Sequence, residues 1–367
     1  MSPRQTASRF IAGRPLSDCI AAGRDNILTL RLLAALLVVF GHSYIVAPDA
    51  SLADPLNRLL PRTHMHIVGV MMFFCISGFL ITLSWLRRPK LLRFLRARVL
   101  RLWPALILCV FAWAFVFGPL LSDGSPRTYF ASGDVYAYAF GNASLFRLYW
   151  NLPGVFTSNP VPQVVNASLW TIPVEAALYL CVAAAGVLGL FRFRWLLSLS
   201  IATAFVALVL LPMYAGFAGA LRVEWLGAVL AGFFGAGSIA CLLSRHVPIS
   251  TPLMLLLVLA CGCARASALE APLVSLAICY FVLWFAYVPR IPAMPRGFDL
   301  SYGTYLWAFP LQQTLVTAGV RDPLALFAIA TPIVLLIAAL SWTLVEKPAL
   351  HLKDDVRWRR RVATEPA

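Results

Sequence analysis

Long apolar stretches recur along this chain, and short polar or basic connections separate them. An α-helix needs about 20 predominantly apolar residues to cross a bilayer. Applied from the N-terminus, this length rule predicts ten membrane-spanning helices at residues 27–48, 67–86, 104–121, 168–190, 195–213, 223–242, 252–268, 271–288, 300–319 and 323–345. The pattern therefore predicts an all-α fold, a polytopic membrane helix bundle without a separate soluble domain.

The composition of the 367 residues agrees with lipid as the solvent of this chain. Hydrophobic residues make up 61% of it and charged residues only 12%, about half of what a soluble domain carries. The formal net charge of +15 would suit a nucleic-acid partner if the basic residues formed an exposed face of a folded module. They lie between apolar segments instead, so nucleic-acid binding is excluded. The eight cysteines lie mostly inside apolar segments and show no disulfide pattern.

The distribution of Lys and Arg predicts the orientation of the bundle. With a cytoplasmic N-terminus, the inner segments hold 22 of these residues and the outer segments seven. The positive-inside rule then predicts that both termini are cytoplasmic. The predicted organisation is an N-terminal tail at 1–26, a transmembrane domain at 27–345 and a C-terminal tail at 346–367. The first apolar run has span length and no small-residue cleavage site, so a removed signal peptide is not expected.

Residues 122–167 form the one long connection predicted on the outer side. This loop is rich in Pro, Gly, Asn and Ser, and an aromatic stretch at 136–150 interrupts it. Such a stretch either lies in the membrane interface or re-enters the membrane. A connection of this length is a candidate platform for an acceptor substrate.

Two ionisable residues lie within the first predicted span, where lipid penalises charge. Arg31 and His42 are eleven residues apart, which is about three helical turns, so they share one helix face and lie roughly 16 Å apart along the axis. Arg31 is about one turn from the cytoplasmic end, and the alternative is that it only reaches to the lipid headgroups. His42 lies too deep for that and is a candidate functional residue.

Glu175 lies in the fourth predicted span, about as far from the outer surface as His42, roughly 10 Å. A carboxylate beside an imidazole fixes its tautomer and stabilises the imidazolium, which suits a general base that takes a proton from a hydroxyl. A buried His–Glu pair can equally be a structural contact. Ser168 and Tyr179 add polar atoms to the same helix face.

The inner connection at residues 87–101 holds seven basic residues and no acid. Arg93, Arg96 and Arg101 are expected along a short helix, before Pro104 opens the next span. Arginine forks suit phosphate groups, and this cluster lies on the same side of the membrane as Arg31. The alternative is ordinary positive-inside charge that binds anionic lipid.

Signatures of other chemistry are weak or missing. His64 and His66 form an H-x-H pair in an outer loop, but zinc needs further ligands and no suitable cluster stands nearby, so no metal site is expected. The chain contains no G-x-x-x-x-G-K-[ST], no H-E-x-x-H and no G-x-S-x-G.

Six short motifs, in order and spanning nearly the whole chain, resemble those of acyltransferase family 3, integral membrane proteins that O-acylate carbohydrates. They are Arg31 and His42 as R-x10-H, FFCISGFLI at 73–81, Arg98 and Arg101 before Pro104, SLWTIPVEAALYL at 168–180 with Glu175, SYGTYLWAFPLQQ at 301–313, and EKP at 346–348. Two positions depart from the family pattern. Ala308 stands where many relatives carry a His, and Ala97 interrupts a paired Arg, leaving Arg96 and Arg98 on either side.

The resemblance implies an O-acyltransferase of the bacterial inner (plasma) membrane. It would move an acyl group, expected to be acetyl, from cytoplasmic acyl-CoA to a hydroxyl of a lipid-linked or exported glycan on the outer side. His42 and Glu175 would be catalytic, and Arg31, Arg96, Arg98 and Arg101 would hold the acyl-CoA. Direct transfer and a transient acyl-histidine both remain open.

The resemblance also bears on partners. The esterase-like domain that some relatives carry is missing, so the bundle is expected to act alone or with separate glycan-assembly proteins, in contact with membrane lipid. Two other functions share the predicted spans and buried charges. One is a transporter or flippase for a small metabolite or glycolipid, and the other is a non-catalytic partner of a polysaccharide assembly machine.

Overall fold

The computed structural model describes residues 13–47, 49, 54–61, 63–207, 223–292, 294–295 and 297–352, and helices dominate them. The elements are β1 (Arg14–Pro15), α2 (Leu16–Ala21), α3 (Ile27–Val46), α4 (Pro55–Leu59), α5 (Met65–Arg87), α6 (Leu91–Ala112), η1 (Trp113–Phe117), α7 (Gly118–Leu121), α8 (Pro126–Ala131), α9 (Gly133–Tyr136), η2 (Ala137–Gly141), α10 (Asn142–Ser144), η3 (Ala167–Trp170), α11 (Thr171–Val187), η4 (Leu190–Arg192), α12 (Arg194–Phe205), α14 (Val223–Leu242), β2 (Pro248–Ile249), α15 (Thr251–Cys263), α16 (Glu270–Tyr287), α17 (Ser301–Thr317), α18 (Pro323–Ser341), η7 (Trp342–Glu346) and α19 (Lys347–His351). Within the described residues, the short antiparallel pair of β1 and β2 is the only sheet. The predicted all-α fold is confirmed.

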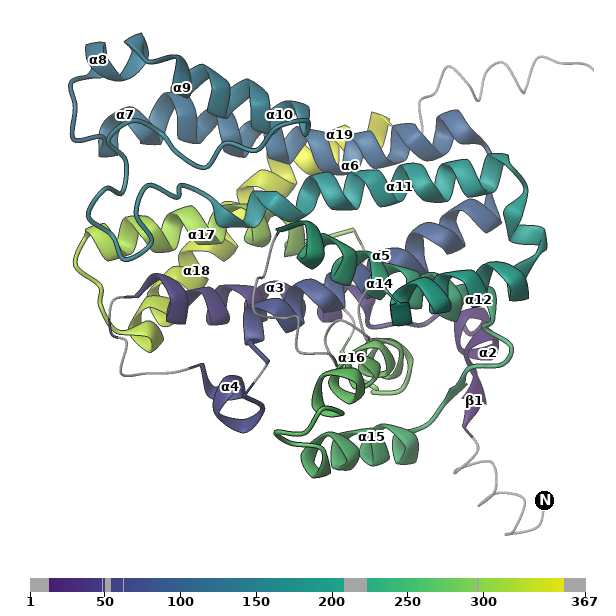
Figure 1. The fold of residues 1–367 in the computed structure, drawn as a ribbon. Coiled ribbons are helices and arrows are strands. Elements are labelled where there is room, and N and C mark those ends of the chain that lie inside the picture. Colours follow the sequence, from purple (N-terminus) through teal and green to yellow (C-terminus); the bar gives the residue numbers. More distant parts are fainter. Residues whose placement is uncertain are drawn as a thin grey trace, which may run out of the picture.

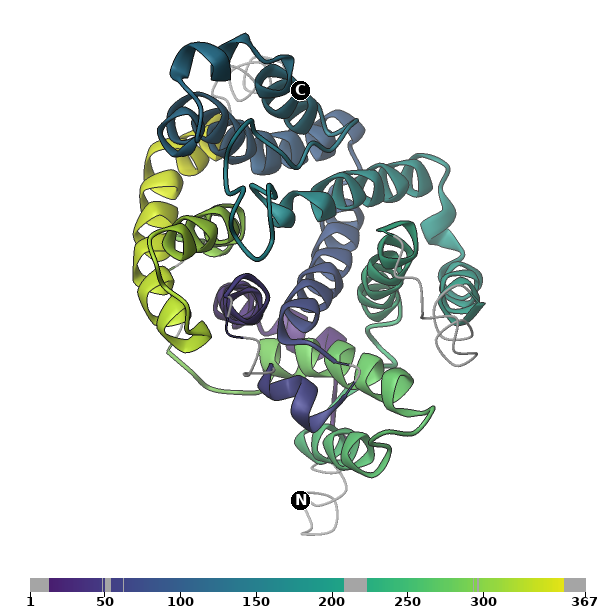
Figure 2. The same ribbon diagram turned by 60° about the vertical axis from the view of Figure 1, so that its left-hand side comes forward.

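Helix α3 lies at the centre of the bundle. Figure 2 shows it almost end-on, with α5 beside it and the yellow-green helices α17 and α18 on another side. α3 packs against α5, α16, α17 and α18, and α5 packs in turn on α14 and α11. In Figure 1, α6 and α11 run side by side above this centre, while α15 and α16 lie below it. Polar side chains on the enclosed faces of α3 therefore point into protein and not into lipid.

Glycines allow α5 to approach both of its main neighbours closely. A Cβ on Gly41 or Gly69 would collide with the backbone across the α3–α5 contact, and a Cβ on Gly78 or Gly237 would do so across the α5–α14 contact. Small residues let helix backbones come together in lipid, where van der Waals packing replaces the hydrophobic effect as the force between helices. These contacts fix α3 and α5, which carry much of the site described below.

Six helical segments are long and apolar enough to cross a membrane. They are Ile27–Val46, Met65–Arg87, Leu91–Leu121, Ala167–Val187, Glu270–Tyr287 and Pro323–His351. Three further apolar helices are shorter, at Arg194–Phe205, Leu226–Leu242 and Thr251–Cys263, and α17 has 17 residues. Each of the ten predicted spans thus coincides with a helix, although residues 208–213 of the fifth lie outside the described part. Ten crossings and cytoplasmic termini remain predictions.

The basic stretch at 87–101 differs from the prediction. Instead of a connection with its own short helix, α6 begins at Leu91 and continues through Pro104, so most of the arginines belong to the same helix as the following apolar residues. With η1 and α7 this helix runs for 31 residues, about 46 Å. Proline is tolerated inside a membrane helix when neighbouring groups satisfy the freed carbonyl. Arg98 and Arg101 consequently project from a rigid helix into the bundle.

Both predicted tails contain ordered structure that packs on the bundle. Leu16 in α2 is fully buried in a cluster with Ile249 and Met254. At the other end, the last long helix passes through a π-helical turn, η7, and ends at His351. Glu346 lies in that turn and is only 2% exposed.

The long connection at 122–167 folds back on α6. Its aromatic stretch is helical through α9, η2 and α10, and the indole of Trp103 on α6 donates a hydrogen bond to the carbonyl of Ala143. Asn159 and Gln313 join the end of this connection to α17, because the Asn159 amide donates to both the backbone and the side-chain oxygen of Gln313. The two placements predicted for residues 136–150, in the membrane interface or re-entering the membrane, both stay predictions.

Candidate active site

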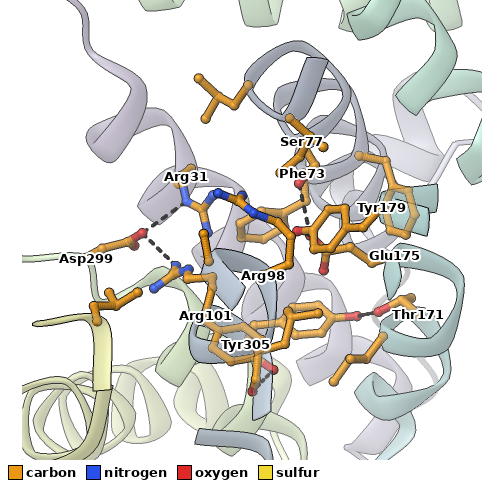
Figure 3. Close-up of a pocket in the computed structure, with 18 of the residues that line it drawn as sticks. Arg31, Phe73, Ser77, Arg98, Arg101, Thr171, Glu175, Tyr179, Asp299 and Tyr305 are labelled. Carbon is orange, nitrogen blue, oxygen red and sulfur yellow. Dashed lines mark hydrogen bonds and ion pairs between the residues drawn. The ribbon is translucent and has the colours of Figure 1, made fainter. Parts of the chain in front are cut away.

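A cavity of about 320 Å³ lies between α3, α5, α6, α11 and α17. Figure 3 shows Arg31, Arg98 and Arg101 reaching into it, with Asp299 on one side and Glu175 and Tyr179 on the other. Phe73, Ile172 and Trp342 contribute apolar walls. A polar cavity inside a membrane bundle is a candidate binding site, because buried charge in lipid is costly and is rarely kept without a function.

Asp299 joins two of the three arginines. Its Oδ2 lies 3.3 Å from Nε of Arg31 and 2.7 Å from Nη2 of Arg101. Its Oδ1 accepts hydrogen bonds from the backbone and the hydroxyl of Ser301, the first residue of α17. Burial alone would raise the pKa of Asp299, but Arg31, Arg101 and the Ser301 hydrogen bonds lower it well below its usual range. Asp299 is therefore ionised and fixes both guanidinium groups.

Arg101 has a second counter-ion in Glu346. Nη1 of Arg101 lies 3.3 Å from Oε2 of Glu346, and Ser341 donates to the other carboxylate oxygen. The guanidinium also lies over the rings of Tyr302 and Trp342, 5.5 and 5.9 Å from their centroids. Arg101 is thus held from several sides, by Asp299 before α17, by Tyr302 on α17, and by Trp342 and Glu346 in η7.

Arg98 is held differently. Its guanidinium lies 5.7 Å from the ring centroid of Phe94 and 5.8 Å from that of Tyr179. Its Nε is buried without a hydrogen-bond partner, and no ion pair to it is found among the described residues. A buried donor without a partner costs free energy unless a ligand or water satisfies it. Arg98 is the arginine of this cavity that is ready to donate to a bound anion or carbonyl.

Glu175 faces the same cavity and not His42. Its Oε1 accepts hydrogen bonds from Ser77, at 3.1 Å, and from the hydroxyl of Tyr179 one turn along α11. Glu175 also attracts Arg98 electrostatically. The contact with His42 that the sequence suggested does not form, because the shared depth of two helices does not determine which way their side chains turn.

His42 is buried at the other end of α3. Its ring lies 5.1 Å from the centroid of Phe309 on α17 and 5.5 Å from that of His66 on α5. Its Nδ1 has no hydrogen-bond partner in the described part of the chain. Gln312, one turn after Ala308 on α17, ties α3 in place here by donating to the carbonyl of Val39 and the hydroxyl of Ser43.

Arg31 and His42 do share one face of α3, as their spacing predicts. Arg31 contacts Phe73 on α5 and Ser301 on α17, and His42 contacts the same two helices further along. The cavity wall reaches Val70 and Tyr305. Val70 lies four residues after His66 on α5, and Tyr305 lies four residues before Phe309 on α17. Four residues of helix are about one turn, or 6 Å. The cavity therefore ends about one helical turn from His42.

Arg96 and Arg93 lie away from the cavity wall. Arg96 is exposed, and its Nη2 donates to the carbonyl of Leu352 at 2.6 Å. The structure thus brings Arg31, Arg98 and Arg101 together and leaves Arg96 at the surface. No group of three or more His, Cys, Asp or Glu side chains that could hold a metal occurs in the described part of the chain.

Sequence reasoning did not assign Asp299, Tyr305 or Gln312. Asp299 is one of only 15 acids in the chain and stands two residues before the S-Y-G of the 301–313 motif, which is the signal that could have found it. The Tyr305 hydroxyl lies 2.7 Å from Oγ1 of Thr171 and donates to the carbonyl of Ser168, so it joins α17 to the start of α11. Gln312 belongs to the Q-Q pair of the same motif.

These features define a class, that of multi-pass helical membrane proteins with a charged cavity enclosed in the bundle. The family model of an acyltransferase domain, acyltransferase family 3, matches residues 25–344, and the chain belongs to this family. It is 28% identical over 340 residues to the O-acetyl transferase of Shigella phage Sf6, covering 87% of this chain and 94% of that protein. It is also 28% identical over 373 residues to nodulation protein 10 of Rhizobium leguminosarum bv. viciae, covering 94% of this chain and 98% of that protein. No solved structure matches the chain.

Proposed function

We propose that this membrane acyltransferase transfers an acetyl group from cytoplasmic acetyl-CoA to a hydroxyl of a lipid-linked or exported glycan on the outer side of the bacterial inner membrane. Family membership and the name of the phage relative support O-acetyl transfer. The observation that carries the proposal is the charged cavity that begins at Arg31 and ends about one turn from buried His42.

Arg98 is the proposed contact of the donor inside the cavity. Its Nε has no hydrogen-bond partner among the described residues, and a guanidinium suits both a phosphate and a polarised carbonyl. Arg31 and Arg101 are already paired with Asp299 and hold the shape and charge of the cavity floor. Arg96, exposed at the surface, adds attraction for the phosphates of the donor.

Glu175 balances the charge of the donor site in this proposal. Three arginines line the cavity, and three carboxylates, those of Glu175, Asp299 and Glu346, offset their charge. A neutral cavity admits the uncharged pantetheine arm of the donor more readily than a strongly cationic one. Glu175 also fixes Tyr179, whose ring covers the guanidinium of Arg98.

His42 is the proposed general base. The acceptor hydroxyl attacks the thioester carbonyl as His42 takes its proton, the carbon–sulfur bond breaks, and CoA leaves as the thiolate. A transient acyl-His42 would divide the same transfer into two steps. In both routes the acyl group crosses the bundle along α3 while CoA stays on the inner side.

The test uses purified full-length protein in nanodiscs with radiolabelled acetyl-CoA and a panel of polyprenyl-linked oligosaccharides. The expected result is release of free CoA thiol together with label in the glycan. The His42→Ala variant should release neither, whereas His246→Ala, a histidine that packs on Trp195 and does not line the cavity, should match the wild type. Glycolipid movement across the bilayer without CoA release would contradict the proposal and indicate a flippase.

A further inference from the structure

The site described above leaves one cluster of titratable side chains unused. His42, His66 and His64 form a row of three imidazoles, with ring centroids 5.5 Å apart between the first two and 5.7 Å apart between the last two. The row runs from buried His42 through half-buried His66 to exposed His64. Beyond it, the amide of Asn57 lies 3.5 Å from Nε2 of His64.

We propose that His66 and His64 form a proton relay that carries the proton taken up by His42 to the aqueous surface beyond the end of α3. The inference rests on the proposed acyl transfer and adds two residues to it. His66 acts through His42 and does not touch the reacting atoms.

The unpartnered ring nitrogens support a relay. Nδ1 of His42 and Nδ1 of His66 are both buried, and neither has a hydrogen-bond partner among the described residues. A neutral imidazole has one nitrogen that accepts a proton and one that donates, so a row of rings can pass a proton along. The described side chains form no direct hydrogen bond between these rings, and centroid separations of this size suit transfer through one bridging water.

The charged and titratable groups around the row favour transfer over storage of the proton. His66 interacts electrostatically with His64 and Asp54, and His42 interacts electrostatically with His66. Asp54 is largely occupied by backbone donors, since it accepts from the amides of Leu56 and Met65 at 2.8 Å. His66 is also the second residue of α5, where the positive end of the helix dipole disfavours an imidazolium. The proton is therefore driven onward to exposed His64.

The relay completes the proton balance of the transfer. The new ester C–O bond forms and the thioester C–S bond breaks. The hydroxyl proton passes from His42 to His66, then to His64 and to water at that surface. The CoA thiolate takes a proton from water at the Arg31 end, so no oxidant, reductant or further reactant is needed.

The decisive variant is His66→Gln in the full-length protein in nanodiscs, assayed with acetyl-CoA and polyprenyl-linked oligosaccharides. A positioned proton-transfer group contributes about 10²–10⁴-fold. We expect kcat to fall at least about tenfold with an unchanged KM for acetyl-CoA, a shifted pH profile of kcat, and partial recovery of His66→Ala by added imidazole. His246→Gln is the matched control and should leave kcat and the pH profile unchanged.

An unchanged kcat and pH profile in folded His66→Gln would overturn the relay, and so would a change confined to the KM of the glycan. If His66→Gln does not fold, exposed His64→Gln decides: the relay predicts a rate that rises with buffer concentration, and a rate independent of buffer refutes it. A wild type that releases no CoA thiol with any glycan would instead refute the proposed function itself.

Discussion

The two ends of the α3 face satisfy their polar groups in opposite ways. At the arginine end, Arg31 and Arg101 share Asp299, and Arg101 has Glu346 in addition. At the histidine end, Nδ1 of His42 and Nδ1 of His66 have no partner among the described residues, and their rings contact mainly other rings. One end is a completed ion-pair network, and the other is a row of groups with unused hydrogen-bonding capacity.

This difference separates residues that stabilise the fold from residues that are available to contact a substrate. A buried charge that loses its counter-ion destabilises the protein strongly, so most substitutions at the arginine end will disturb folding as well as binding. Replacing a buried group that has no hydrogen bond leaves no partner unsatisfied, so the loss of stability is limited to lost packing. Arg98 is the exception at the arginine end, because it lines the cavity without an ion pair in the described part of the chain.

The largest expected effect is that of His42→Ala on catalysis. If His42 is the general base, the variant should lose about 10²–10⁴-fold in kcat. The variant should still fold, because no described residue loses a hydrogen bond to Nδ1, and its thermal unfolding temperature should fall only by the packing lost against His66 and Phe309. CoA release and thermal unfolding measured on the same preparation test both parts, and acyl transfer at the wild-type rate would remove His42 from the mechanism.

The next effect is that of Arg101→Ala on stability. The substitution leaves Asp299 without one partner and Glu346 without its counter-ion, and breaking a buried pair costs about 3–5 kcal/mol. The measurement is thermal unfolding of the purified protein, or its yield if it does not survive purification. Adding Glu346→Gln to the Arg101 variant should restore part of the loss, and a double variant no more stable than the single one would contradict the assigned pair.

Arg98→Ala should instead weaken donor binding while leaving the protein folded. A hydrogen bond to a charged group contributes about 1.5–3 kcal/mol, which is about one to two decades in affinity. Acetyl-CoA binding by calorimetry is the measurement, and Arg98→Lys, which keeps the charge but loses the fork, should show an intermediate affinity. Unchanged affinity in well-folded Arg98→Ala would place the donor elsewhere.

The smallest effect is expected for Arg96→Ala. Its guanidinium is exposed and bonded to the carbonyl of Leu352, and pairs at the surface contribute about 0.2–1 kcal/mol. Donor affinity should fall by less than about fivefold, and the loss should disappear at high salt because exposed charges are screened. The loss in Arg98→Ala should persist at the same salt concentration, so a salt titration of both variants compares an arginine at the surface with one in the cavity.

Hydropathy predicted the helices well, because the bilayer allows few alternatives to a helix of span length. The spacing of Arg31 and His42 placed both on one face for the same geometric reason. The partner of Glu175 could not be predicted, since the rotation of α11 about its axis depends on packing with α5 and α6. Asp299 was missed because it lies outside every apolar segment and gains its role only when α17 brings it between two arginines.

The π-helical turn at Trp342–Glu346 sets the angular phase of the C-terminal segment. One residue inserted into an α-helix rotates everything after it by about 100°. Loss of a single residue in this turn would rewind it as a regular helix and swing either the Glu346 carboxylate or the preceding helix face away from Arg101. The exact length of this segment, and not only its composition, is thus under constraint, and insertions or deletions here should be far less tolerated than substitutions at its exposed Leu344.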